Sequence, residues 1–193
     1  MKRKIGVIGA GNVGKALSRG ADRAGHEVRM VARDPAQTRE VVAWAEIVIL
    51  AIPFYAIDSV VNRIGDGFGG KIVVDVTNAL TQDMNLALGY TTSGAEELQK
   101  KLPAARVVKA FNTVFAQHMD TGKLGDKPLT ALVAADDGDA KQAVLELARD
   151  IGFDAVDAGP LKNARMLEPM AFLDIQLGYA LGMGPQIGFE LLH

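Results

Sequence analysis

Apolar residues along the chain fall into short unbroken runs that alternate with segments of helical spacing. The run 47–52 has no polar alternation, which is typical of a strand covered on both faces. In the segment 12–24 the apolar residues lie three and four positions apart, as they do on one face of a helix. The same patterns predict further strands at 5–8, 27–31, 71–76, 106–110, 129–134 and 155–156, and further helices at 35–44, 55–64, 94–102 and 139–151.

The alternation of predicted strands and helices indicates the fold class. Parallel neighbouring strands need crossover connections, and helices supply them. We therefore expect an α/β fold, with a Rossmann-like, doubly wound and mostly parallel sheet followed by a short C-terminal helical segment. The polar segment 78–92 lacks periodicity and follows a predicted strand, where the loops of such sheets reach a ligand.

The character of the chain changes after Gly159 and Pro160. Residues 166–183 are apolar on nearly every side, and a helix of that kind must be covered on every side. It could pack on its own domain, or part of it could form a subunit interface or line a substrate pocket. We favour an interface, and hence a homodimer through this segment, because one terminal helix cannot bury all its faces on one sheet. One apolar stripe consists of Met166, Met170, Leu173 and Leu177, and another of Phe172 and Tyr179.

A glycine-rich motif joins the first predicted strand to the first predicted helix. Gly9 permits a tight turn, Gly11 lets a pyrophosphate approach the backbone, and Gly14 lets the helix pack against the strand. The helix N-terminus offers free N–H groups to the phosphates. In this context the motif indicates dinucleotide binding, so we expect an NAD(P)-binding domain at 1–159 and a C-terminal helical segment at 160–193. The motif is Gly9-Ala10-Gly11-Asn12-Val13-Gly14.

The end of the second predicted strand distinguishes the two nicotinamide cofactors. NAD-binding sheets usually place a carboxylate there, to hold the ribose 2′-hydroxyl. This chain has Ala32 at that position and Arg33 after it, and a guanidinium matches the geometry of a 2′-phosphate. If the strand ran two residues longer, Asp34 would take the carboxylate role and the cofactor would be NAD. Asp34-Pro35 is better interpreted as the cap of the next helix, so we favour NADP(H).

Further candidate residues follow the strands whose carboxyl ends border the nicotinamide position. Thr77 and Asn78 could hydrogen-bond the ribose or the carboxamide, although ordinary turn chemistry also explains them. Asn112 is the single, weak catalytic candidate, and its alternative role is to cap a turn or helix. His118 is better explained as a surface or capping residue than as an acid. The third predicted strand ends in Ala51, Ile52, Pro53 and Phe54.

The composition excludes several classes of protein. The 193 residues include 21 basic and 23 acidic side chains, so no basic excess exists to bind nucleic acid. The chain has no cysteine, which excludes disulfides, thiolate metal sites and a cysteine nucleophile. We expect no metal site, because only His26, His118 and His193 are available and they are scattered. No run is long enough to span a membrane, and we expect cytoplasmic residence.

Several of these stretches together resemble the NADPH-dependent F420 reductase family, and most closely a shortened branch of its dinucleotide-binding oxidoreductases. The resemblance implies a Rossmann oxidoreductase that moves hydride between NADP(H) and the deazaflavin coenzyme F420, or a flavin-like acceptor. It covers nearly the whole chain. The similar stretches are 5–33, 47–54, 74–78 and 107–113, with a C-terminal signature in Gly159-Pro160-Leu161-Lys162-Asn163-Ala164-Arg165 and Leu167-Glu168-Pro169.

The resemblance also implies roles for individual residues. Gly9 to Val13 would cradle the pyrophosphate, and Arg33 would hold the 2′-phosphate. Ile52, Pro53 and Phe54 would flank the nicotinamide, and Ala110, Phe111 and Asn112 would border the cleft. The chain departs from the family at Ala10 and Ala32, where typical members carry hydroxyls, and at Asn112, where they carry a histidine. It is also shorter between Arg33 and Ile47, so the sheet edge beneath the adenine should be reduced.

Three functions compete at this point. The first is an NADPH-dependent reductase of a flavin, deazaflavin or other small acceptor, in which hydride transfer depends on stacking geometry more than on a strong base. The second is a non-catalytic NADP(H)-binding sensor. The third is a relative of the 3-hydroxyacid or pyrroline carboxylate reductases, which the few residues after Gly159 disfavour. Metal reduction of the kind catalysed by related membrane proteins is less favoured, because it depends on a membrane haem domain.

Overall fold

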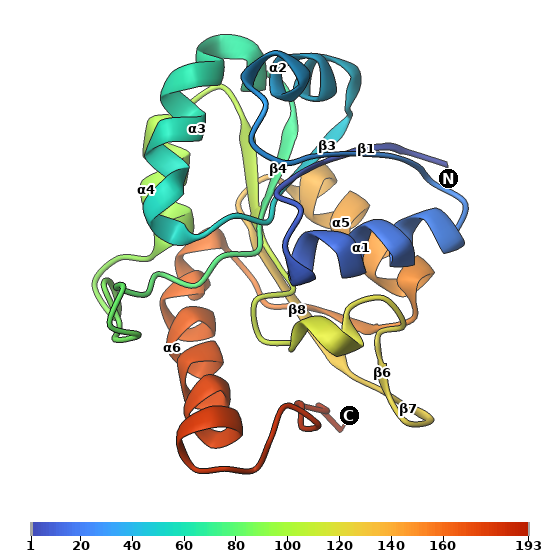
Figure 1. Ribbon diagram of the computed structural model, residues 1–193, viewed down its shortest axis with the longest axis vertical. Coiled ribbons are helices and arrows are strands. Elements are labelled where there is room, and N and C mark those ends of the chain that lie inside the picture. The colour runs from blue at the N-terminus through green and yellow to red at the C-terminus, as the bar shows by residue number, and fades with distance from the viewer. Residues whose placement is uncertain (1, 193) are drawn as a thin grey trace.

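The computed structural model describes residues 2–192, and a seven-stranded sheet forms its centre (Figure 1). The strand order is β2-β1-β3-β4-β5-β8-β9. The first five of these strands are parallel, β8 runs antiparallel to β5, and β9 is parallel to β8. The α/β, mostly parallel sheet predicted from the sequence is confirmed. The strands are β1 (Lys4–Ile8), β2 (Glu27–Val31), β3 (Ile47–Leu50), β4 (Ile72–Asp75), β5 (Arg106–Lys109), β8 (Thr130–Ala135) and β9 (Asp154–Asp157).

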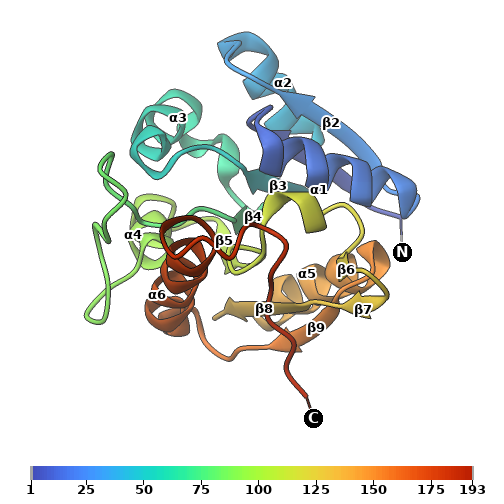
Figure 2. The ribbon, with the colours of Figure 1, turned by 60° about the horizontal axis from the view of Figure 1, so that its bottom comes forward.

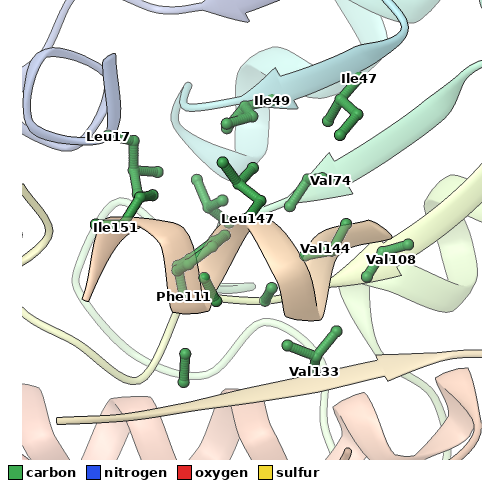
Figure 3. Close-up of a cluster of buried hydrophobic side chains, with 14 of the residues drawn as sticks. Leu17, Ile47, Ile49, Val74, Val108, Phe111, Val133, Val144, Leu147 and Ile151 are labelled. Atoms are coloured by element: carbon green, nitrogen blue, oxygen red, sulfur yellow. The ribbon is translucent and has the colours of Figure 1, made fainter. Parts of the chain in front are cut away.

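Helices cover both faces of the sheet, as a doubly wound fold requires. Strand β3 shows why its sequence lacks alternation: Ile47 and Ile49 pack with α1 and α5, while Val48 and Leu50 pack with α2, α3 and α4 (Figure 3 shows the first cluster). The predicted capping residues Asp34 and Ser93 lie at the N-caps of α2 and α4. The helices are α1 (Asn12–Arg23), α2 (Pro35–Trp44), α3 (Ile57–Ile64), α4 (Gly94–Lys101), α5 (Gly138–Ile151) and α6 (Ala164–Ile175).

Strand β2 is the edge strand beside the glycine motif. The chain returns from it through α2 directly to β3, which pairs with β1. The reduced sheet edge expected from the short segment after Arg33 is therefore confirmed.

The structure departs from the predicted elements between β5 and β8. The connection contains a 3-10 turn, Ala116–His118, and the small hairpin of β6 (Lys123–Leu124) and β7 (Lys127–Pro128). Because the connection supplies no long crossover helix, β8 returns antiparallel to β5. Runs of two paired residues leave no periodic pattern, so the sequence did not indicate this hairpin.

The predicted helix at 166–183 is also different in the structure. It begins at Ala164, is regular to Ile175, and continues as a π-helical turn, Gln176–Ala180. Gly182 and Gly184 then adopt positive φ angles of 74° and 77°, and the chain leaves the helix. The last residues run back across the sheet end towards β8, where the Thr130 amide donates to the Phe189 carbonyl (Figure 2).

Candidate functional site

The glycine motif forms the tight loop between β1 and α1. Gly9 has a φ of +116°, and a side chain there would collide with the Ala51 carbonyl oxygen. A side chain at Gly14 would collide with the Gly9 carbonyl oxygen, so the helix can approach the loop closely only with glycine. At Gly11, the N-cap of α1, a side chain would meet nothing within 4 Å. Gly9 and Gly14 are thus required by the fold, whereas Gly11 faces open space at a helix N-terminus.

A cleft of about 390 Å³ opens beside this loop. It brings together the glycine loop, the end of β2 and the end of β3, which are three separate parts of the sequence. Its lining residues are Gly9, Ala10, Gly11, Ala32, Arg33, Ala51, Ile52 and Pro53.

Eight predicted residues lie outside the lining of this cleft: Asn12, Val13, Phe54, Thr77, Asn78, Ala110, Phe111 and Asn112. Phe54 lines a separate cavity with Tyr55 and Leu88, on the side of α3 and α4. Asn12 lines a small neighbouring pocket that also contains Lys15 and Gln117. Val13 is partly buried and packs against the hydrophobic core.

Asp34 and Arg33 have different surroundings, and the difference bears on the cofactor. The Asp34 carboxylate caps α2, where its Oδ1 accepts hydrogen bonds from the Ala36 and Gln37 amides at 2.9 and 3.0 Å. The helix-cap interpretation of Asp34 is therefore confirmed. Arg33 is exposed at the rim of the cleft, and no side chain among residues 2–192 forms an ion pair or hydrogen bond with it. A free guanidinium beside a phosphate-type loop suits a 2′-phosphate.

A second group of polar residues gathers where β4 and β5 end. The Asn112 Nδ2 donates to the Asn78 Oδ1 and to the Leu167 carbonyl, both at 3.0 Å. A carbonyl can only accept, so the orientation of this amide is determined by its partners. The Asn112 Oδ1 and the Thr77 Oγ1 are left buried without a hydrogen-bond partner in the described chain. Unpaired buried polar atoms are costly, and each requires an explanation such as a ligand.

The two residues before Asn112 belong to the hydrophobic core. Ala110 and Phe111 are fully buried (Figure 3 shows Phe111), and the Phe111 and Phe153 ring centroids are 5.5 Å apart. Phe111 also has a φ of +64°, a strained conformation for a residue with a bulky side chain. This strained residue lies between the end of β5 and Asn112, whose amide donates to the Leu167 carbonyl on α6.

A buried ion cluster lies beside Thr77, whose carbonyl oxygen accepts a hydrogen bond from Lys109. The Lys109 Nζ is 3.0 Å from the Asp75 Oδ2 and 2.9 Å from the Glu168 Oε1, and all three side chains have 0% exposure. Burial alone would lower the pKa of the Lys109 ammonium, but the adjacent carboxylates of Asp75 and Glu168 outweigh it and raise that pKa. No pattern in the sequence predicted this cluster. A lysine at the end of an apolar strand was the only local signal.

Asp174 was also missed, and it lies on the face of α6 that packs against the body of the protein. The residue is only 4% exposed, and burial raises the pKa of its carboxyl to about 6. Along the chain it lies between two contacts with the segment after β5: Leu167 of α6 with Asn112, and Tyr179 of the π-helical turn with Phe115.

His118 is buried rather than on the surface and does not line the cleft; its Nε2 is 3.1 Å from the Pro185 carbonyl oxygen, so it anchors the C-terminal residues. Within residues 2–192 no group of three or more His, Asp or Glu side chains could hold a metal ion, and His193 lies outside the described residues. No helix in the same range is long and apolar enough to cross a membrane.

Comparison with known proteins adds to this geometry. The family model for NADP oxidoreductase, coenzyme F420-dependent, matches residues 4–79. The F420-dependent NADP reductase of Methanothermobacter marburgensis is 30% identical over 185 residues, which are 89% of this chain and 80% of that protein. The crystal structure of a candidate F420-dependent NADP reductase from Arthrobacter sp. FB24 superimposes with a TM-score of 0.90 at 29% identity, covering 99% of this chain and 100% of that one.

The chain is also similar in sequence to one part of a longer protein. The metalloreductase STEAP3 of Rattus norvegicus is 32% identical over 178 residues, which are 86% of this chain. The chain spans about a third of the length of that relative, since the match covers 36% of it. The match to the archaeal reductase covers 80% of that protein, against 36% of STEAP3, and the family model matches the segment that contains the glycine motif. This chain belongs to the F420-dependent NADP oxidoreductases, an enzyme family whose cofactor is NADP(H).

Proposed function

We propose that this protein transfers hydride between NADPH and a deazaflavin, flavin or other small acceptor. One observation carries the proposal: a single cleft joins the open Gly11 backbone, the unpaired Arg33 guanidinium and the carboxyl end of β3. These are the parts needed for a pyrophosphate, a 2′-phosphate and a nicotinamide in one extended ligand. The Asp34 carboxylate already accepts hydrogen bonds as the cap of α2, which argues against its binding the ribose 2′-hydroxyl of NAD.

The residues of the cleft fit this cofactor in a definite order. The loop Gly9 to Val13 and the first amides of α1 would hold the pyrophosphate, because these N–H groups have no partner within the helix. Arg33 would bind the 2′-phosphate alone on its side, because Ala10 and Ala32 offer no hydroxyl. Ile52 and Pro53 would flank the nicotinamide, which supplies the hydride when the cofactor is bound.

The polar groups past β4 and β5 would fix the nicotinamide end. Both hydrogens of the Asn112 amide nitrogen are donated within the protein, so only its oxygen is free for a ligand. A free acceptor selects a donor, and the carboxamide N–H group of a nicotinamide is one. The Thr77 hydroxyl can donate or accept, and it suits the ribose. Asn112 would therefore orient the ring and would not move a proton.

We also propose that a second copy of the chain covers the exposed face of α6. The stripe predicted from the sequence is only partly covered by its own domain: Met166 is 61% and Leu173 is 53% exposed, while Met170 and Leu177 are half-buried. The opposite face carries Leu167 and Ala171, which are buried. A helix whose two faces are both apolar supports the homodimer through the segment 160–193.

The proposed activity is tested by titrating the purified protein with NADPH and NADH, and then adding a flavin or F420 to the same sample. We expect preferential binding of NADPH, followed by its oxidation with at least one acceptor. Binding of NADPH without turnover on any acceptor would overturn the proposed hydride transfer and favour a sensor. Preference for NADH would overturn the assignment of Arg33.

A further inference from the structure

The buried cluster of Asp75, Lys109 and Glu168 joins four parts of the fold. Asp75 ends β4 and Lys109 ends β5, where the two residues are register partners in neighbouring strands. Glu168 comes from α6, and its Oε2 accepts a hydrogen bond from the Gly94 amide at 2.9 Å. Its Oε1 accepts a second, longer bond from the Ala95 amide, at the N-terminus of α4. One ammonium group thus lies where two strands and two helices meet.

The same cluster binds both backbone polar groups of Thr77, its amide and its carbonyl. The Lys109 Nζ donates to the Thr77 carbonyl oxygen at 2.5 Å, and the Asp75 Oδ1 accepts from the Thr77 amide at 2.9 Å. The backbone of Thr77 is fixed on both sides, while its hydroxyl remains unpaired. The position of that hydroxyl is therefore set by the cluster.

The cluster also determines where Asn112 lies. Glu168 holds α6 against Lys109, and the preceding residue, Leu167, offers the carbonyl that orients the Asn112 amide. If α6 moved away from β5, this carbonyl would move with it, and the Asn112 amide could turn. The positions of two free atoms, the Asn112 Oδ1 and the Thr77 Oγ1, thus both depend on Lys109. It acts on Thr77 directly and on Asn112 through Glu168 and α6.

We infer that Lys109 is a positioning residue for the nicotinamide end of the cofactor site, acting through Thr77 and through the contact of Glu168 on α6. The inference rests on the proposed function, because it assumes that the free atoms of Thr77 and Asn112 meet the nicotinamide and its ribose. The adenine end should be unaffected, since within residues 2–192 no hydrogen bond or ion pair joins Arg33 or the glycine loop to the cluster.

The charge of Lys109 is essential to this role. Removing one partner of a buried ion pair leaves the other as an uncompensated buried charge, so the cluster must rearrange when the lysine is lost. The two carboxylates would then repel each other, and α6 is the element best able to move because its outer side, with Met166 and Leu173, is exposed. The C-terminal helix is in this way coupled to the reacting end of the site.

A comparison of two ligands tests the inference. NADPH spans the whole site, whereas adenosine 2′,5′-bisphosphate carries the adenine and the 2′-phosphate without a nicotinamide. We would measure the binding of both by calorimetry to the wild-type chain, to Lys109→Met and to Glu168→Gln. Lys101→Met is the matched control, because Lys101 pairs with Asp58 at the surface, away from the cluster.

The Lys109→Met variant should bind NADPH about tenfold more weakly, since two ordinary hydrogen bonds are together worth about that factor. Its affinity for the bisphosphate should stay within about twofold of wild type, which also shows that the variant is folded. Glu168→Gln should show a smaller loss of the same kind, and Lys101→Met no change in either ligand.

Unchanged NADPH affinity in Lys109→Met would overturn the inference, as would parallel losses of both ligands in Lys109→Met and Glu168→Gln, since the cluster would then support the whole domain. If Lys109→Met does not fold, Glu168→Gln decides by the same criterion. A wild-type chain that binds neither ligand refutes the proposed function itself, so the two failures are distinct.

Discussion

Replacing Arg33 with alanine tests the nucleotide assignment at a single side chain. Arg33 lines the cleft, is exposed, and forms no ion pair or hydrogen bond with the described residues. Its loss should therefore change the stability of the fold by no more than about 0.5 kcal/mol. Any effect on binding can then be assigned to the ligand.

The size of that effect follows from the chemistry of the contact. A hydrogen bond between a guanidinium and a phosphate is worth about 1.5–3 kcal/mol. This range corresponds to a loss of roughly tenfold to a hundredfold in NADPH affinity. NADH has no 2′-phosphate, so its affinity should change little.

The assay is a calorimetric titration of wild type and Arg33→Ala with NADPH and with NADH, at one ionic strength. Arg29→Ala is the matched control, because it removes the same charge from strand β2 at a residue that stacks on Trp44 and does not line the cleft. Equal losses for both nucleotides, or the same loss in Arg29→Ala, would refute the role of Arg33.

Three further predictions concern stability and assembly. Gly14→Ala should destabilise the protein strongly in chemical unfolding, because its new methyl group meets the Gly9 carbonyl oxygen; wild-type stability would contradict the packing role. The Asp174 pKa of about 6 lies above the value of 3.8 for the free residue, so the unfolded chain releases this proton first and stability should fall by about 2 kcal/mol as the pH rises from 4 to 6. Asp174→Asn should abolish that decrease, and an unchanged pH profile would refute it. Leu173→Glu should convert the proposed dimer to a monomer in sedimentation, whereas an unaltered dimer would place the interface elsewhere.

The parts of the fold that the sequence predicted are those with local causes. Strand β3 was recognised because its residues face two different cores, which removes the polar alternation. Helix α2 was recognised from Asp34 and Pro35, which cap and begin it within three residues. The glycine loop and Arg33 needed only the order strand, loop, helix, strand, so the cleft was also largely predictable.

The parts that were missed depend on contacts between distant residues. The cluster of Asp75, Lys109 and Glu168 joins three segments that lie far apart along the chain, and none of the segments alone shows why a lysine would be buried. The Asn112 amide donates one hydrogen to Asn78 and the other to the Leu167 carbonyl on α6. Its oxygen is recognised as the free atom only when both of these distant partners are known. The end of α6 depends on close packing of Gly178 against Phe115, which no periodicity records.

The central claim is hydride transfer from NADPH at the cleft of Gly11 and Arg33. The most direct measurement mixes the protein with NADPH and, separately, with NADH in the absence of oxygen, adds F420 or a flavin, and follows oxidation of the nicotinamide. We predict rapid oxidation of NADPH by at least one acceptor, and a rate with NADH at least about tenfold lower at equal, subsaturating concentrations. Equal rates with both nucleotides, or no oxidation of bound NADPH by any acceptor, would contradict the account.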